Sequence, residues 1–148
     1  MKIKTRSYSH AVGEFNFHIQ LTSAYRRQIF ADEKVMKLTK AYLVAKIDGL
    51  KINLVAMEFG PDHVHIFVAD CKNHAPCKLI QFLKGFSSRM MRKNHWSLFR
   101  VALYGDKFWS AGYFCRSIGE TTSEAVEHYI KESQSKHWDN TLRPSGRG

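Results

Sequence analysis

The chain has 148 residues, of which 44% are hydrophobic and 13% aromatic, and this composition excludes a disordered polymer and fits a single packed domain. Its 23 Lys and Arg residues outnumber its 13 Asp and Glu residues, and the formal net charge of +10 favours a polyanionic partner. No apolar run approaches the length of a membrane span, and the first residues lack the apolar stretch of a signal peptide, so we expect a soluble cytoplasmic protein. Three cysteines are an odd count, which favours free thiols.

The first half of the chain predicts three strands and one helix. Residues 15–21 alternate between apolar and polar, which is typical of a strand with one buried face and one wetter face. The wetter face carries Asn16, His18 and Gln20. Residues 32–48 repeat apolar side chains at helical spacing. Residues 51–59 and 63–69 predict two more strands, joined by a turn at residues 60–62.

The second half predicts two helices and a fourth strand. A helix should begin near Pro76, because proline is favoured in a first helical turn. Its expected apolar stripe consists of Leu79, Leu83, Phe86 and Met90. Residues 96–107 are predicted to be irregular, residues 108–118 to form a strand, and residues 121–136 to form a last helix that opens with a capping box.

The order strand, helix, strand, strand, helix, strand, helix predicts an α+β fold of the ferredoxin-like, split βαβ (βαββαβ) type. Such a fold has an antiparallel four-stranded sheet with helices on one face, here followed by a C-terminal helix. We assign it to one domain at residues 1–138, followed by a disordered tail at residues 139–148. Because this fold serves many functions, the function must be argued from the site.

The most informative pattern is His63-Val64-His65. Residues two apart on a strand point to the same face, so the two imidazoles should project together while Val64 packs into the core. Two adjacent imidazoles are half of a divalent metal site, and an oxygen as third ligand would leave positions for phosphate oxygens. The alternative is a pair of buried or solvated histidines with no role in metal binding.

Four segments resemble, in order and at normal spacing, the single-tyrosine HUH transposases of small insertion sequences, REP-associated relatives included. Residues 18–27 are similar to the opening strand and tyrosine-arginine turn of that family, and residues 59–68 (FGPDHVHIFV) resemble its metal strand. Residues 109–119 and 127–130 (EHYI) are similar to its last strand and catalytic helix. The resemblance implies a transposase that cleaves and rejoins single-stranded ends of its own element, recognises short DNA hairpins, and works as a homodimer with sites completed in trans.

Tyr129 is the predicted nucleophile. A phenolate that attacks phosphorus gives a phosphotyrosine, which conserves the energy of the broken bond for rejoining. The resemblance implies a 5′-phosphotyrosine, a free 3′-hydroxyl, and a divalent metal, Mg²⁺ or Mn²⁺, at His63 and His65. Without the motif match, Tyr129 would be read as a packed helix tyrosine.

The third metal ligand departs from the family pattern. A glutamine usually lies four residues after the tyrosine, whereas this chain has Ser133 there and Gln134 one residue later. Four residues advance roughly 40° around a helix and five roughly 140°, so Gln134 would point away from the Tyr129 face. Glu132, three residues on, stays near that face. Glu132 and Gln134 both remain candidates, with Ser133 or water behind them.

Basic and aromatic residues provide a candidate DNA path. The predicted phosphate-contacting group is Arg26, Arg27, Arg89, Arg92, Lys93 and Arg116. Trp96, Trp109 and Tyr113 could stack on unpaired bases. Two other functions fit the same layout: a non-catalytic RNA-recognition-like nucleic-acid-binding module, and a metal-dependent phosphodiesterase that activates water.

Overall fold

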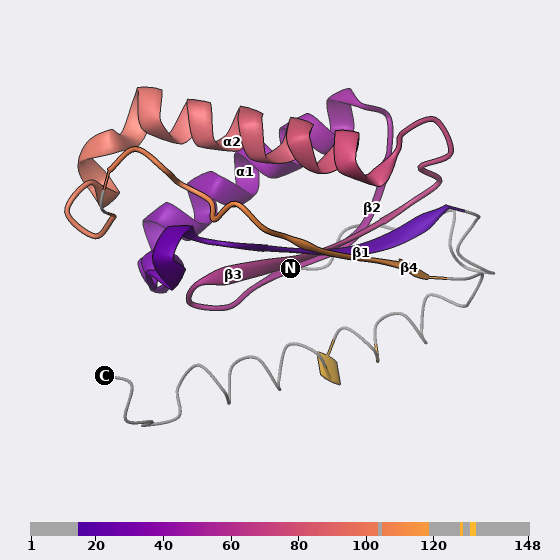
Figure 1. Ribbon diagram of the computed structural model, residues 1–148, viewed down its shortest axis with the longest axis horizontal. Coiled ribbons are helices and arrows are strands. Elements are labelled where there is room, and N and C mark those ends of the chain that lie inside the picture. Colours follow the sequence, from indigo (N-terminus) through magenta and orange to yellow (C-terminus); the bar gives the residue numbers. More distant parts are fainter. Residues whose placement is uncertain (1–14, 104, 119–127, 129–130, 133–148) are drawn as a thin grey trace.

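The computed structural model describes residues 15–103, 105–118, 128, 131 and 132 (Figure 1). Its four strands form one antiparallel sheet in the order β2-β3-β1-β4. The strands are β1 (Asn16–Thr22), β2 (Asn53–Phe59), β3 (His63–Ala69) and β4 (Phe114–Ile118). The helices α1 (Glu33–Gly49) and α2 (Pro76–Phe99) lie together on one side of the sheet. The predicted α+β, ferredoxin-like fold is confirmed, with β3 in the interior of the sheet.

The two faces of β3 are both buried but differ in chemistry. Val64, Ile66 and Val68 belong to the main hydrophobic core, together with the buried side chains of α1 and α2. Because side chains alternate along a strand, His63, His65 and Phe67 lie on the opposite face. The sheet therefore separates an apolar layer under the helices from a layer that holds imidazoles.

Helix α1 forms where the sequence predicts it. The carboxylate of Asp32 caps its first turn by accepting from the backbone N–H groups of Lys34 at 2.9 Å and Val35 at 3.2 Å. One stripe of the helix is buried at four-residue intervals against the sheet. These residues are Val35, Thr39, Leu43 and Ile47.

Helix α2 is longer than predicted, and its buried stripe is displaced. Residues 96–99 were predicted to be irregular but are helical, beyond a local break at His95 (φ −137°, ψ 23°). The His95 imidazole lies 2.9 Å from the Tyr42 hydroxyl of α1, a contact that fixes this last turn. The buried positions include Leu79, Leu83, Ser87 and Met91, whereas Phe86 and Met90 are only half-buried.

The fourth strand is shorter than the predicted 108–118. Trp109 makes one isolated bridge with Ser23, and regular pairing starts only at Phe114. The ammonium group of Lys84 donates to the backbone carbonyls of residues 110, 111 and 112, at 2.7, 3.2 and 3.3 Å. A side chain from α2 therefore satisfies the carbonyls of this segment, while the Ser110 N–H bonds the Thr22 carbonyl of β1 at 2.8 Å. The residue pattern of the segment does not reveal this.

Two of the three residues predicted on the wetter face of β1 are buried, contrary to the prediction, and the third, Gln20, is half-buried. Asn16 and His18 are each only 2% exposed. The His18 ring stacks on Phe67 with centroids 4.2 Å apart, and Asn16 bonds the backbone of Ile118 and Asp70. Polar residues alternate here because their partners are also buried in the sheet, not because the face meets solvent.

The predicted last helix and tail fall largely on positions outside the described residues. Within 121–136 the described positions 128, 131 and 132 are helical. The predicted tail at residues 139–148 lies outside them. The three cysteines are free thiols, as predicted. In the described part of the chain no helix is both long and apolar enough to cross a membrane.

Candidate active site

The two predicted histidines lie side by side at the start of β3. His63 and His65 are 1% and 0% exposed, and their ring centroids are 5.0 Å apart at an interplanar angle of 86°. Two imidazoles that ligate one ion at about 2.1 Å place their ring centres roughly 4.5–5 Å apart. The spacing of the pair therefore fits two ligands of a single divalent ion.

The carboxylate of Asp62 holds the first imidazole. Its Oδ1 lies 2.8 Å from Nδ1 of His63, and its Oδ2 accepts from Nε of Arg26 at 3.0 Å. Burial alone would raise the pKa of Asp62, but the hydrogen bond to His63 and the Arg26 charge outweigh burial and lower it. A carboxylate at Nδ1 keeps the proton on that nitrogen, so Nε2 is the atom of His63 with a lone pair for a metal.

The contact of Arg26 with Asp62 depends on an unusual backbone conformation at residues 25 and 26. Tyr25 and Arg26 both have a positive backbone φ, 58° and 54°, which residues other than glycine rarely adopt. The segment is held by bonds from Ala24 N–H to the Phe108 carbonyl at 2.9 Å and from the Ser23 hydroxyl to the Arg27 carbonyl at 2.6 Å. This turn places the Arg26 guanidinium on Asp62, with the Arg26 side chain still 63% exposed.

The second imidazole is held by a third histidine. Nε2 of His18 on β1 lies 2.9 Å from Nδ1 of His65, and the His18 ring also meets Phe114 edge-on with centroids 5.4 Å apart. If His65 binds a metal through Nε2, its Nδ1 carries the proton and donates it to His18. Each imidazole of the pair thus has a partner at Nδ1, and Nε2 is the atom that could ligate a metal in both.

Gly60 is required by the position of the His63 ring. A Cβ atom at residue 60 would lie 2.3 Å from Cε1 and 2.7 Å from Nε2 of His63. The tight turn that brings the two together is closed by a bond from Gly60 N–H to the His63 carbonyl at 2.8 Å. Any side chain at position 60 would therefore displace the imidazole.

Only some of the other predicted site residues are among those that the structure describes. Tyr129, Ser133 and Gln134 lie outside the described residues. Glu132 is described, with its carboxylate 3.1 Å from Nε2 of His128 and its side chain 65% exposed. Among residues 15–103, 105–118 and the three described positions near the C-terminus, no three His, Cys, Asp or Glu side chains gather to hold a metal. The histidine pair therefore fits two metal ligands, and a third is not assigned.

The predicted phosphate-contacting residues are spread over several elements. Arg26 contacts Asp62, Arg92 donates to the Asp106 carbonyl at 2.8 Å, and Arg89 lies over the Phe86 ring. The remaining members are exposed or half-buried and are Arg27, Lys93 and Arg116. Trp109, predicted to stack on bases, is instead 5% exposed and bonds Ser87 through its indole N–H at 2.9 Å. Trp96 and Tyr113 are exposed.

Sequence reasoning missed the three residues that position the pair. The sequence places Asp62 in a turn and His18 on the polar side of a strand, both within segments of the family resemblance, but indicates no role for either side chain. A carboxylate directly before His-x-His is a usable signal, because an adjacent acid can reach Nδ1. The contacts of His18 and Gly60 depend on strand register and turn geometry, which no local pattern indicates.

Known structures share this fold. A crystal structure from Deinococcus radiodurans R1, of a protein assigned as a transposase, superposes with a TM-score of 0.63 and 27% identity over 89% of this chain and 98% of that one. A REP-associated tyrosine transposase bound to a REP hairpin superposes with a TM-score of 0.60 over 93% of this chain and 76% of that one. At 13% identity the second likeness shows the fold alone. The fold is that of a DNA-processing enzyme of the transposase class.

The sequence comparisons give the family. Residues 11–133 match the family model described as "Transposase IS200 like", so the chain belongs to the IS200-like transposases. It is 28% identical to the ISDra2 transposase TnpA of Deinococcus radiodurans, over 90% of this chain and 91% of the relative. It is 25% identical to the transposase for insertion sequence element IS200 of Salmonella typhimurium, over 85% of this chain and 81% of the relative. The predicted family is confirmed.

Proposed function

We propose that this transposase cleaves and rejoins single-stranded DNA at the ends of an insertion sequence, through a covalent 5′-phosphotyrosine at Tyr129. The observation that carries the proposal is the imidazole pair of His63 and His65, each held at Nδ1 on an internal strand. Paired histidines with fixed tautomers suit phosphodiester chemistry better than a purely structural role. The family supports the same substrate class.

The attacking group is the Tyr129 phenolate. It forms a bond to phosphorus, the bond from phosphorus to the 3′ oxygen breaks, and that oxygen leaves as a 3′-hydroxyl after taking a proton. The phosphotyrosine retains a bond of similar energy, so attack by a 3′-hydroxyl rejoins DNA and releases the tyrosine without ATP. Cleavage and rejoining each break one bond to phosphorus and form another, and neither step changes an oxidation state.

His63 and His65 would hold a divalent ion, Mg²⁺ or Mn²⁺, with Glu132 or Gln134 as the third ligand. Bound there, the ion would polarise the scissile phosphate and stabilise charge on the leaving oxygen. Asp62 and His18 would keep both rings in the ligating orientation. The contact of Glu132 with His128 uses Oε2, so Oε1 of the same carboxylate could contribute to the metal.

Hairpin DNA and a homodimer are part of the proposal. The REP-associated structure is described as bound to a REP hairpin, and we propose a short hairpin near the element ends as the ligand here. We also propose that the histidine pair of one subunit is completed by the tyrosine helix of the other. If so, mixing His63→Ala protein with Tyr129→Phe protein should restore cleavage once subunits exchange.

The test is covalent capture. Single-stranded oligonucleotides from the genomic flanks of the gene should shift on a denaturing gel with wild-type protein and with Tyr113→Phe, a control tyrosine that is 50% exposed on the approach to β4. Tyr129→Phe should bind but neither nick nor attach. Cleavage by Tyr129→Phe at the wild-type rate would assign the protein to the hydrolytic phosphodiesterases instead. Binding by all three proteins without cleavage would make it a non-catalytic nucleic-acid-binding module.

A further inference from the structure

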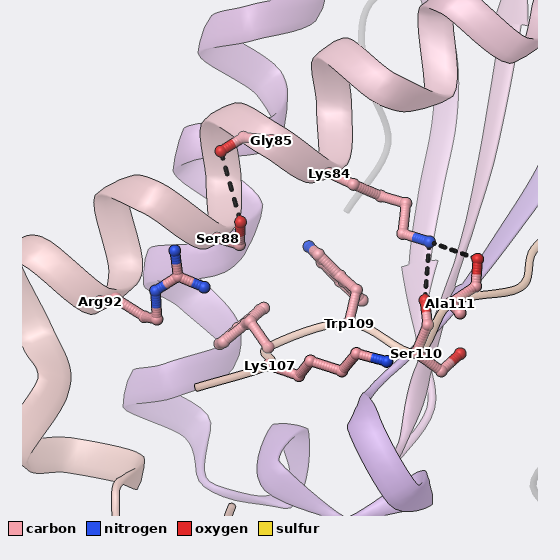
Figure 2. A pocket seen from close by; sticks show the side chains of 9 residues that line it. Lys84, Gly85, Ser88, Arg92, Lys107, Trp109, Ser110 and Ala111 are labelled. Atoms are coloured by element: carbon pink, nitrogen blue, oxygen red, sulfur yellow. Dashed lines mark hydrogen bonds between the residues drawn. The ribbon is translucent and has the colours of Figure 1, made fainter. Parts of the chain in front are cut away.

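A second site lies outside the histidine face. A cavity of about 240 Å³ opens between α2 and the segment 107–111 that leads into β4 (Figure 2). Lys84, Ser88 and Arg92 line it from α2, and Lys107 and Trp109 line it from the other wall. The indole of Trp109 is fixed by its bond to Ser87, so this wall is rigid.

The cavity gathers positive charge. Lys84, Arg92 and Lys107 surround it, and among the described residues that line it there is no Asp or Glu. Burial, and then the charge of Lys107, lower the pKa of Lys84. Lys84 and Arg92 are fixed by the backbone carbonyls of Ser110 and Asp106, at 2.7 and 2.8 Å. Like charges held this close repel one another, and an anion between them would relieve that repulsion.

The shape of the charged surface suits an extended DNA strand better than a compact ion. Lys84, Ser88 and Arg92 lie four residues apart, so they form one row along α2. Eight residues of helix span about 12 Å. A DNA strand carries one phosphate charge per nucleotide, so a row of this length can meet more than one phosphate.

The cavity lies at the same end of the sheet as the imidazole pair. Trp109 bridges Ser23, and Ser23 donates its N–H to the carbonyl of Asp62 at 2.9 Å. Adjacent paired backbones are about 4.8 Å apart, so Trp109 and Asp62 are separated by roughly 10 Å of backbone. The imidazole pair faces away from the helices and the cavity lies on the helix side. A DNA strand with its scissile phosphate at His63 would therefore pass around the β4 edge of the sheet to reach the cavity.

We propose that this cavity is a phosphate-binding subsite, in which Arg92 and Lys107, beside the positive charge of Lys84, hold the backbone of the substrate DNA strand a few nucleotides from the scissile phosphate. The inference rests on the proposed function, since it takes that strand as the ligand. It assigns a role to α2 and to the irregular approach to β4. The subsite positions the strand and takes no part in bond breaking.

The test compares two single-charge removals. Lys107→Gln removes an exposed cavity charge, and Lys72→Gln removes an exposed charge in the loop after β3, at the far end of that strand. Affinity for a flank oligonucleotide is measured over a series of salt concentrations. Lys107→Gln should weaken binding several-fold and reduce the slope of log K against log salt by about 0.7. Lys72→Gln should behave as wild type.

Single methylphosphonate substitutions along the oligonucleotide locate the contact. Neutralising one phosphate a few nucleotides from the cleavage position should weaken wild-type binding, and the same substitution should add little in Lys107→Gln. Equal effects of Lys107→Gln and Lys72→Gln, with wild-type cleavage intact, would overturn the subsite alone. Failure of the wild-type protein to bind or cleave any single-stranded flank would overturn the proposed function and this inference with it.

Discussion

The two faces of β3 are equally buried and differ in what a substitution there should change. Ile66 and His65 are both 0% exposed, yet Ile66 contacts the apolar core under the helices, whereas His65 is bonded to His18. Burial on the helix side stabilises the fold through apolar area. Burial on the histidine side fixes ring tautomers and orientation, so burial alone does not distinguish a structural from a functional strand residue.

The largest expected effect is the difference between an alanine substitution on the histidine face of β3 and one on its helix face. His65→Ala should reduce cleavage by about a thousandfold, because it removes one of two proposed metal ligands worth several kcal/mol to the transition state. DNA affinity should change little, since phosphate contacts elsewhere provide it. Ile66→Ala should instead lower the free energy of unfolding by about 2–5 kcal/mol while its folded fraction still cleaves. Single-turnover cleavage and urea unfolding measure both, and equal loss of activity in the two variants would erase the distinction.

A smaller effect is expected at His18, which positions His65. His18→Phe keeps a ring to stack on Phe67 but loses the bond to Nδ1 of His65. The metal concentration that gives half-maximal cleavage should rise about 10–100-fold, and excess metal should restore the rate. His74→Phe, a half-buried histidine after β3, is the matched control. A lower rate at an unchanged metal midpoint would make His18 a purely structural residue.

Gly60→Ala tests the close approach of backbone to imidazole. The added methyl group collides with the His63 ring, so cleavage should fall about tenfold and stability by about 1–3 kcal/mol. Gly49→Ala, at the end of α1, meets no atom within 4 Å and should leave both unchanged within about 1 kcal/mol. Wild-type cleavage by Gly60→Ala would show that the His63 ring can move without consequence.

An effect on stability alone is a pH dependence at Asp62. The pKa of this carboxyl is lowered from 3.8 in the folded state, so its stabilising contribution is complete above pH 3.8 and is lost as the pH falls through the lowered value. Asp62→Asn should be less stable than wild type by about 1–3 kcal/mol near neutral pH. The difference should shrink in acid, as measured by urea midpoints. A constant difference down to pH 2 would mean that the charge of Asp62 does not contribute.

The layers of this fold could be predicted from the sequence, because the strands and the helices each have their own regular spacing of buried residues. The alternation of β3 and the four-residue spacing of α1 both appear in the chain itself. The sequence was insufficient where a side chain bonds the backbone of a distant segment, as Lys84 does at the Ser110 carbonyl. The His63–His65 pair was predicted from spacing, but the His18 contact depends on β1–β3 register. Tyr129 remains a prediction from the motif.

One consequence of the core concerns chemical labelling. Burial raises the pKa of the Cys71 thiol to about 12 and also raises that of half-buried Cys115, whereas Cys77 is exposed in the first turn of α2. Maleimides react with the thiolate, so near-neutral pH should give a singly labelled protein without mutating any cysteine. Seven residues of helix place that dye about 10 Å along α2 from Lys84, the lining residue of the cavity nearest to it. A fluorophore on the natural Cys77 can therefore report the arrival of a labelled DNA strand at the cationic cavity by energy transfer.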